Sequence, residues 1–392
     1  MYSTLTLADE SIDAEMVARA TALRPLLEAN AARTESERRV APEVVDALEE
    51  AGLFALVVPK RVGGAGATMA TQLAVGVELG RACASTSWVQ FILNSGTWAA
   101  AMSPAATEIL GSSADRNPPR VCAVLAPSGT ARPVDGGYVV NGRWSFASGS
   151  FCATWFNGGV QILSAAGEPS DLGMVFLPRK DYSIDDTWFV AGMAGTGSNT
   201  VVAEDVFVPA SRLPVLTDAL VEGEESTERW PIGAVLSLGI IGPLIGAAQA
   251  CADAVVARAP KRAISYTSYS RTVDSMVAVT AVAEALLDID TAWIHALRAA
   301  AYVDSIGAGA ARDPMEDALL RGRCGYITQR LRHGVDELLN VAGASSFASS
   351  DSVQRHWRDL TVGSRHAFLA SNVSLETYGR GLFGLDPTMM VV

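Results

Sequence analysis

The stretch GGYVVNGRWSFASG, residues 136–149, alternates apolar and polar side chains in the way typical of a β-strand with one buried face. Asp135-Gly136-Gly137 at its start favours a tight hairpin turn. Four other short stretches in this part of the chain also have strand character: VCAVLAPS (121–128), TWFNGGVQIL (154–163), LGMVFLP (172–178) and NTVVAEDVFVP (199–209). Gly, Pro, Asp and Asn residues separate them. The middle of the chain is therefore predicted to be a small antiparallel β-domain.

Helical periodicity flanks this zone on both sides. From about residue 11 to residue 110, apolar residues recur at spacings of three and four, and Gly52 marks a helix end. After the strands, long helices are expected near 234–260, 267–306, 314–343 and 364–381, which would suit a four-helix bundle. The predicted fold class is α+β and mostly α, in three domains: an N-terminal helical domain (1–115), a middle β-domain (116–225) and a C-terminal helical bundle (226–392).

The composition excludes several classes of protein. The 392 residues are 49% apolar and 18% charged, as in a well-packed globular protein. The formal net charge of −12 argues against nucleic-acid or anionic-membrane binding, because both need clustered Lys and Arg. Five scattered cysteines without a C-x-x-C pair, and only four histidines, predict neither a disulfide framework nor a metal site. Because no secretion signal is apparent, we expect a cytoplasmic protein.

The uncharged stretch Pro231–Ala252 is long enough to suggest a membrane span. It contains Pro243 and several glycines, charged residues flank it, and no second stretch of this kind occurs. A helix buried on all sides within a helical bundle has the same composition. We therefore predict a core helix rather than a membrane helix.

Several nucleotide-binding and hydrolytic motifs are absent. The sequence contains no G-x-x-x-x-G-K-[ST], no G-x-G-x-x-G between a strand and a helix, no G-x-S-x-G and no H-E-x-x-H. The glycine-rich segments GGAG (63–66) and GTGS (195–198) favour ordinary loop geometry. A self-contained NAD(P)H enzyme of the usual kind is therefore not expected.

Four motifs, in the right order, resemble those of the acyl-CoA dehydrogenase superfamily over nearly its full length. With residues 136–149 they are EVVDALEEAGLFALVVPKRVGG (43–64), VCAVLAPSGTA (121–131) and GMAGTGSNTVVAEDVFVPASRL (192–213). The resemblance implies the acyl-CoA dehydrogenase-like fold and a bound FAD. It also implies that Ser128 and Thr130 contact the flavin, and that Ser148 takes the place of the threonine that hydrogen-bonds flavin N5.

The strand period gives an independent expectation for this flavin site. Alternate side chains of a strand share a face, so Trp144, Phe146 and Ser148 should project together. Two aromatic rings and a hydroxyl would form a wall for a flat, partly polar heterocycle, with Phe146 and Ser148 as cofactor contacts. The alternative is an inward aromatic face that ends in an ordinary turn serine.

Residues 358–367, RDLTVGSRHA, depart from the superfamily pattern R-D-A-x-x-x-x-I-Y-E-G-T. Ala367 stands where many dehydrogenases carry the catalytic glutamate, and alanine cannot accept a substrate proton. Only Asp253 lies near the alternative base position on an earlier helix. His366, together with Ser148, is similar to the flavin-dependent monooxygenases on this fold, the oxygenase components of two-component hydroxylases.

This second resemblance implies catalytic roles for His366 and Ser148 in hydroxylating a small aromatic substrate, of indole or polyketide type, through a flavin C4a-hydroperoxide. Reduced FAD (FADH2), or FMN, would come from a separate NAD(P)H-dependent flavin reductase, and O2 would be the cosubstrate. Ser148 would bind N5, and His366 would deprotonate the substrate or stabilise the peroxide. A structural histidine in the helical core is the alternative reading of His366.

Substrate contacts are expected from Trp88, Asn94, Trp98 and His366. Asn94 stands where several of these hydroxylases carry a substrate-facing histidine, which favours a neutral substrate because asparagine cannot carry charge. The helical spacing of Trp88 and Trp98 is also typical of a core. Arg271 resembles the arginine that reaches the adjacent subunit's flavin, which would require an oligomer, usually a homotetramer made of two dimers.

Three other functions remain open on the sequence. The same scaffold could carry out N-oxygenation of an amino sugar, or it could be an acyl-CoA dehydrogenase with a relocated base. A non-catalytic helical scaffold that binds no flavin is the third.

Overall fold

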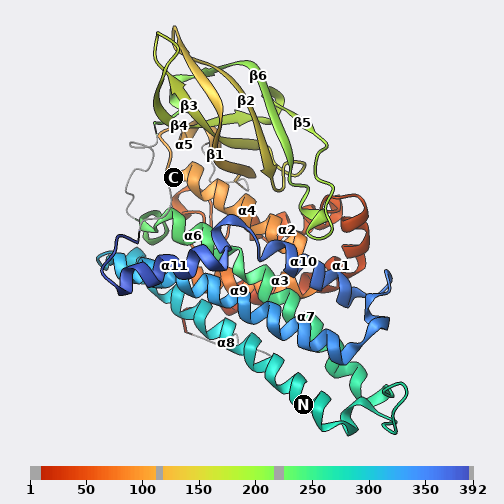
Figure 1. Cartoon of the computed structure of the whole chain (residues 1–392). Coiled ribbons are helices and arrows are strands. Elements are labelled where there is room, and N and C mark those ends of the chain that lie inside the picture. Colours follow the sequence, from red (N-terminus) through yellow and green to blue (C-terminus); the bar gives the residue numbers. More distant parts are fainter. Residues whose placement is uncertain (1–9, 112–117, 216–224, 388–392) are drawn as a thin grey trace.

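The N-terminal part of the chain is helical (Figure 1). The computed structural model describes residues 10–111, 118–215 and 225–387. The first helices are α1 (Ala14–Ser36), α2 (Pro42–Glu50), α3 (Met69–Ala82), α4 (Ala84–Ala101) and α5 (Ala106–Leu110). Asp13 and Thr68 cap α1 and α3 through side-chain oxygens that accept main-chain amides. Gly52, with a φ of 74°, follows α2 and ends it as predicted. The expected domain boundary at residue 115 lies outside the described residues.

The middle part forms one six-stranded sheet in the order β4-β3-β1-β2-β6-β5. Its strands are β1 (Val121–Val134), β2 (Gly137–Ala147), β3 (Trp155–Leu163), β4 (Pro169–Pro178), β5 (Ser183–Asp185) and β6 (Asn199–Pro209). Val134 pairs with Gly137, so Asp135 and Gly136 form a two-residue turn in which Gly136 has a φ of 75°. The predicted hairpin is confirmed.

The prediction of a purely antiparallel sheet is wrong, because β1 and β3 run parallel. β2 returns antiparallel to β1, and the short connection 148–154 then starts β3 at the end where β1 also starts. Trp155 consequently pairs with Val121. Two neighbouring strands that begin at the same edge of a sheet must run in the same direction, so the sheet is mixed.

The C-terminal part is again helical, and the predicted fold class is confirmed. Its helices are α6 (Ile232–Gly239), α7 (Ile241–Arg258), α8 (Met276–Gly307), α9 (Pro314–Ala342), α10 (Ser352–Gly363) and α11 (Ser371–Leu382). Figure 1 shows α8, α9 and α11 side by side, and α9 also packs against α7. The predicted bundle differs in several details: α10 is an additional helix, the first helix is broken at Ile240, and the helices expected from residues 267 and 364 begin only at Met276 and Ser371.

The uncharged run around α6 and α7 lies in the core. Within the described ranges, Ile232–Lys261 is the one helical stretch long and apolar enough to cross a membrane, and 89% of its apolar window is buried. Gly242 and Gly246 allow α7 to approach α3, since an added Cβ would lie 2.9 and 2.4 Å from main-chain oxygens of Leu73 and Val77. This is the environment predicted for a core helix.

Candidate active site

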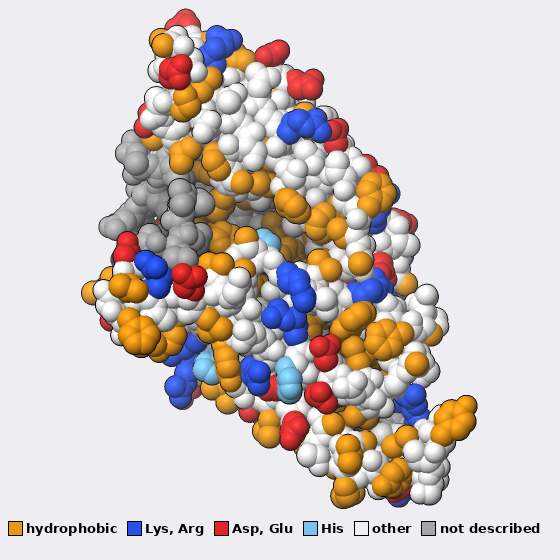
Figure 2. Space-filling view, viewed as in Figure 1, with side chains coloured by type: hydrophobic (Ala, Val, Ile, Leu, Met, Phe, Trp, Pro, Cys, Tyr) orange, Lys and Arg blue, Asp and Glu red, His pale blue; other side chains and the backbone are white. Residues whose placement is uncertain are grey.

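The end of β2 meets the helical part of the molecule at α4. An added Cβ on Gly149 would lie 3.2 Å from Val89 and Leu93, so the turn after β2 packs directly on α4. The 3-10 turn Ala194–Thr196 also packs against α4. Figure 2 shows a hollow between the β-domain and the helices, with hydrophobic side chains along its walls. The candidate site therefore lies where the sheet, α4 and the end of α10 come together.

Trp144 and Phe146 do not share a face, so that prediction is wrong. The pairing of β2 with β6 shifts between Trp144 and Ala147, which inserts one extra residue, and Phe146 has a left-handed φ of 66°. The bulge leaves the Phe146 ring 70% exposed, whereas Trp144 is fully buried. Phe146 instead packs edge-on against Trp188, with ring centroids 5.9 Å apart. The exposed aromatic wall thus consists of Phe146 and Trp188.

Ser148 is the outer member of a chain of three hydroxyl groups. Its Oγ lies 2.7 Å from Ser198 Oγ, and Ser198 Oγ lies 2.7 Å from Thr196 Oγ1. Thr196 Oγ1 donates to the Met193 carbonyl at 2.7 Å. Ser148 is 9% exposed, so it stands where this buried chain reaches the surface. The fold has joined the turn after β2 to the loop before β6.

The Met193 peptide is held on both sides. Its N–H donates to Asp359 Oδ1 at 2.5 Å, and its carbonyl also accepts from Trp188 Nε1 at 3.0 Å and from Thr196 N at 3.1 Å. The Met193 φ of 57° is left-handed, a strain of roughly 1–3 kcal/mol in a residue other than glycine. Burial raises the pKa of Asp359 to about 6, although the Met193 N–H opposes this shift. Helix α10 therefore fixes the loop that carries Thr196 and Ser198.

His366 follows α10 and lies edge-on to Trp88, with ring centroids 5.5 Å apart. Its Nδ1 accepts the Phe368 N–H at 3.3 Å, which places the proton of the neutral ring on Nε2. Burial, and to a smaller extent the positive charge of Arg321, lower the pKa of His366 from 6.5 to about 4. The ring nevertheless remains accessible to solvent. Near pH 7 it is a neutral hydrogen-bond donor at Nε2.

Trp88 and Met193 connect His366 to the hydroxyl chain. An added Cβ on Gly363 would lie 3.5 Å from the Trp88 ring and 3.6 Å from Met193 Cε. Trp88 belongs to α4, on which the turn beginning at Ser148 packs. The structure thus brings His366 and the turn that begins at Ser148, which are distant in sequence, against the same helix, α4.

Asn94 and Trp98, two of the candidate substrate contacts, are fully buried. Asn94 Oδ1 accepts from Val57 N at 3.2 Å, and its Nδ2 donates to Gln72 Oε1 at 2.7 Å. Trp98 Nε1 donates to the Thr227 carbonyl at 2.8 Å. Both side chains therefore stabilise the helical core. Of the candidate substrate contacts on α4, Trp88 is the one that packs against His366.

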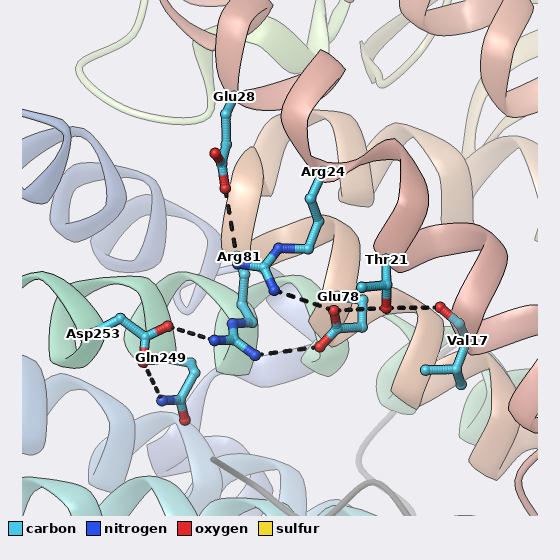
Figure 3. Close-up of polar contacts among 8 residues, drawn as sticks. All are labelled: Val17, Thr21, Arg24, Glu28, Glu78, Arg81, Gln249 and Asp253. Carbon is cyan, nitrogen blue, oxygen red and sulfur yellow. Dashed lines mark hydrogen bonds and ion pairs between the residues drawn. The ribbon is translucent and has the colours of Figure 1, made fainter. Parts of the chain in front are cut away.

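Asp253, the candidate relocated base, belongs to a network of ion pairs between helices (Figure 3). Its Oδ2 accepts from Arg81 Nη2 at 2.6 Å, and its Oδ1 accepts from Gln249 Nε2 at 3.0 Å. Arg81 also contacts Glu78 at 3.4 Å, and Arg24 of α1 reaches Glu78 at 3.4 Å. Asp253 therefore joins α7 to α3.

The exposed part of β1 and β2 fits a flavin. Ser128 and Thr130 are exposed on β1, and the pairing of β1 with β3 is interrupted between Val124 and Gly129. β1 pairs with β2, the strand that carries Phe146 and that Ser148 follows. A flat heterocycle with polar edges can pack against an exposed aromatic ring. Its edges can form hydrogen bonds with hydroxyl groups and with main-chain groups that no neighbouring strand pairs. Ser128, Thr130, Phe146 and Ser148 would hold it.

Arg271 belongs to a different part of the molecule. It lies in the segment before α8, at the end of the helical layer that is remote from the sheet (Figure 1). It is exposed, and its Nη2 pairs with Asp274 Oδ1 at 2.6 Å. Within one subunit the structure does not bring Arg271 to the other candidate flavin contacts.

Four residues of the site were not singled out from the sequence: Trp188, Met193, Thr196 and Ser198. The segment GTGS, 195–198, was interpreted as an ordinary loop, and it does form one. The feature of this segment that could have indicated a site was the pair of hydroxyl residues at 196 and 198, directly before a strand. The chemical partner of that pair, Ser148, is 50 residues away from Ser198, so local sequence could not reveal the contact.

Comparison with known families agrees with this fold. Residues 13–109 match the acyl-CoA dehydrogenase N-terminal domain, and residues 238–371 match the acyl-CoA dehydrogenase C-terminal domain. The architecture is therefore that of the acyl-CoA dehydrogenase superfamily, as the motifs implied.

Three similar proteins indicate to which branch of this superfamily the chain belongs. The flavin-dependent monooxygenase oxygenase subunit HsaA of Rhodococcus jostii is 34% identical over 95% of this chain and 100% of its own length. The oxygenase component of the FADH2-dependent resorcinol hydroxylase of a Rhizobium species is 32% identical over 95% of both chains. The structure of XiaF from a Streptomyces species in complex with FADH2 and glycerol is 33% identical and superposes with a TM-score of 0.93 over 97% of both chains. The chain belongs, within that superfamily, to the flavin-dependent monooxygenases that act as oxygenase subunits.

Proposed function

We propose that this protein is the oxygenase component of a two-component system that uses reduced FAD and O2 to hydroxylate a small aromatic substrate. The observation that carries this proposal is the neutral Nε2–H donor of His366, which packs on Trp88 of α4, the helix on which the turn that begins at Ser148 also packs. Ala367 stands in place of the dehydrogenase glutamate, and Asp253 is paired with Arg81. Oxygen transfer is therefore favoured over removal of a thioester α-proton. The similarity to a resorcinol hydroxylase and a p-hydroxyphenylacetate hydroxylase favours aromatic hydroxylation over the amino-sugar alternative.

The bound flavin would supply the electrons that activate O2, one oxygen atom going to the substrate and the other leaving as water. The chain's own residues bind and position. Phe146 and Trp188 would support the flat ring, and Ser148 would hydrogen-bond its N5 edge. His366 would hold the substrate or the reacting oxygen through Nε2–H, with the aromatic rings of Trp88 and Phe368 packed against it.

The protein should convert an aromatic substrate only when a flavin reductase and NADH supply reduced FAD. The test incubates the protein with a reductase, NADH, O2 and a panel of indoles, phenols, polyketide aromatics and amino sugars, followed by mass spectrometry. We expect an aromatic product heavier by one oxygen atom, labelled from ¹⁸O2. Reduction of bound oxidised FAD by butyryl- or octanoyl-CoA, or N-oxidation of the amino sugar alone, would contradict the proposal.

A cytoplasmic homotetramer made of two dimers is also part of the proposal. Large apolar side chains are exposed along α8 and before it, as expected of a surface that a neighbouring subunit covers: Tyr266, Tyr269, Met276, Val277, Leu287 and Ile294. Arg271 lies beside this surface, where it could reach the flavin of an adjacent subunit but not that of its own.

Arg271→Ala should weaken FAD binding about tenfold without changing the oligomeric state, because a charged hydrogen bond to a phosphate is lost. Arg258→Ala is the matched control, since Arg258 is another exposed arginine paired with an aspartate, Asp351. Equilibrium titration gives the affinity, and sedimentation gives the mass. A monomer in solution, or equal FAD affinities for the two variants, would rule out this role of Arg271.

A further inference from the structure

The three-hydroxyl chain permits only one arrangement of its protons. A carbonyl oxygen has no proton, so Thr196 must donate to Met193 O. Ser198 must then donate to Thr196, and Ser148 must donate to Ser198, because each hydroxyl has a single proton. Any other order leaves one of the three contacts without a proton. Ser148 therefore donates its proton to Ser198, and its oxygen can act toward a ligand only as a hydrogen-bond acceptor.

The anchor of this chain is rigid. The Met193 carbonyl accepts three hydrogen bonds, from Thr196 Oγ1, Thr196 N and Trp188 Nε1, and the Met193 N–H is held by Asp359. Thr196 and Ser198 are both buried, so water does not compete for their hydroxyls. The direction of the proton chain is consequently set by the fold rather than by the ligand.

We propose that Thr196 and Ser198 are positioning residues that fix Ser148 as a hydrogen-bond acceptor, and that the site thereby binds reduced flavin in preference to oxidised flavin. The N5 of reduced flavin carries a proton and can donate to the Ser148 oxygen. The N5 of oxidised flavin carries only a lone pair and would face another lone pair. This inference rests on the proposed function and adds to it a device for accepting flavin in the reduced state.

Ser198→Ala should allow Ser148 to act as a hydrogen-bond donor toward the flavin. With its acceptor removed, the Ser148 hydroxyl is free to rotate and to donate to oxidised N5. We expect oxidised FAD to bind more tightly, and the ratio of its Kd to that of reduced FAD to fall about five- to tenfold, the range of one neutral hydrogen bond. Anaerobic titrations give both constants. The ¹⁵N signal of N5 in oxidised FAD should also move upfield as it accepts the new bond.

Two further variants separate positioning from a general structural effect. Thr196→Val should lower the same ratio, and the conservative Thr196→Ser should restore it. Ser150→Ala is the matched control: Ser150 is buried and donates to the Gly197 carbonyl at 3.1 Å, but it has no place in the chain. It should leave the ratio within twofold of the unsubstituted protein.

The outcomes distinguish this inference from the proposed function. If Ser198→Ala weakens the binding of both redox forms equally, or shifts the ratio no more than Ser150→Ala, Ser198 is merely structural and the inference is wrong. That outcome does not contradict the proposed function, which the product assay tests separately. If the unsubstituted protein binds neither form of flavin, the proposed function fails and the inference fails with it.

Discussion

His366→Ala should lower the rate of product formation about 100-fold or more, the lower end of what a positioned proton-transfer group contributes. The variant loses the Nε2–H donor beside Trp88 but none of the candidate flavin contacts. Reduced FAD should therefore still bind and still react with O2, with the oxygen released as hydrogen peroxide instead of entering the product. The measurement is the ratio of hydroxylated product to NADH consumed, together with the peroxide formed.

His366→Gln retains a side-chain N–H donor and should recover part of the loss, since the structure assigns a donor role to Nε2. His333→Ala is the matched control, because His333 is an exposed histidine paired with Asp288 on the outer helices. The pKa of His366 near 4 keeps its ring neutral as the pH falls from 8 to 5, so the deficit of His366→Ala should persist throughout that range. If the difference between His366→Ala and the unsubstituted protein disappears below pH 6.5, the His366 ring titrates at its ordinary pKa and is inactive when protonated. That result would contradict the lowered pKa of His366 in this structure.

Trp144→Ala should reduce the free energy of unfolding by about 3–5 kcal/mol, the usual cost of truncating a buried tryptophan. The Trp144 indole is fully buried, packs on Phe156 with centroids 5.1 Å apart, and donates to the Gly159 carbonyl at 2.7 Å. Added Cβ atoms at Gly129 and Gly142 would lie 2.4 and 2.3 Å from the ring, so these positions are closely fitted to it. Urea unfolding followed by circular dichroism measures the change.

Trp144→Phe retains most of the ring volume but leaves the Gly159 carbonyl without its donor, so a smaller loss of about 1–2 kcal/mol is expected. Trp155→Ala is the comparison on β3 of the same sheet, where the side chain is only half-buried. If Trp144→Ala costs no more than Trp155→Ala, Trp144 does not hold β1, β2 and β3 together in the way its burial indicates.

Much of the fold could be predicted because its signals are local. Gly52 and the Asp135-Gly136 turn act through their own backbone conformations, and both predictions are confirmed. The parallel pairing of β1 with β3 could not be predicted in the same way. It depends on which side of β1 the third strand joins the sheet, and no residue within β3 encodes that choice.

The candidate site was predictable only in part. Ser148 and His366 came from motif positions, and the structure places His366 and the turn that begins at Ser148 against the same helix, α4. The expectation for Trp144 and Phe146 failed because strand periodicity assumes a regular strand, and a bulge with a left-handed Phe146 interrupts it. Asn94 was expected to contact the substrate, but it is a buried core residue. Its hydrogen-bond partners, Val57 and Gln72, belong to other segments, so the sequence around Asn94 could not reveal them.

Sequence alone determined the three-part architecture, the core helix at α7 and the loss of the dehydrogenase glutamate at residue 367. Each of these follows from residue types and short-range spacing, on which helices, turns and acid–base chemistry depend directly. Only the tertiary structure decided the direction of the hydroxyl chain to Ser148 and the tautomer of His366. Hydrogen-bond direction is set by which groups meet in space, and here those groups come from distant segments that packing against α4 and α10 brings together.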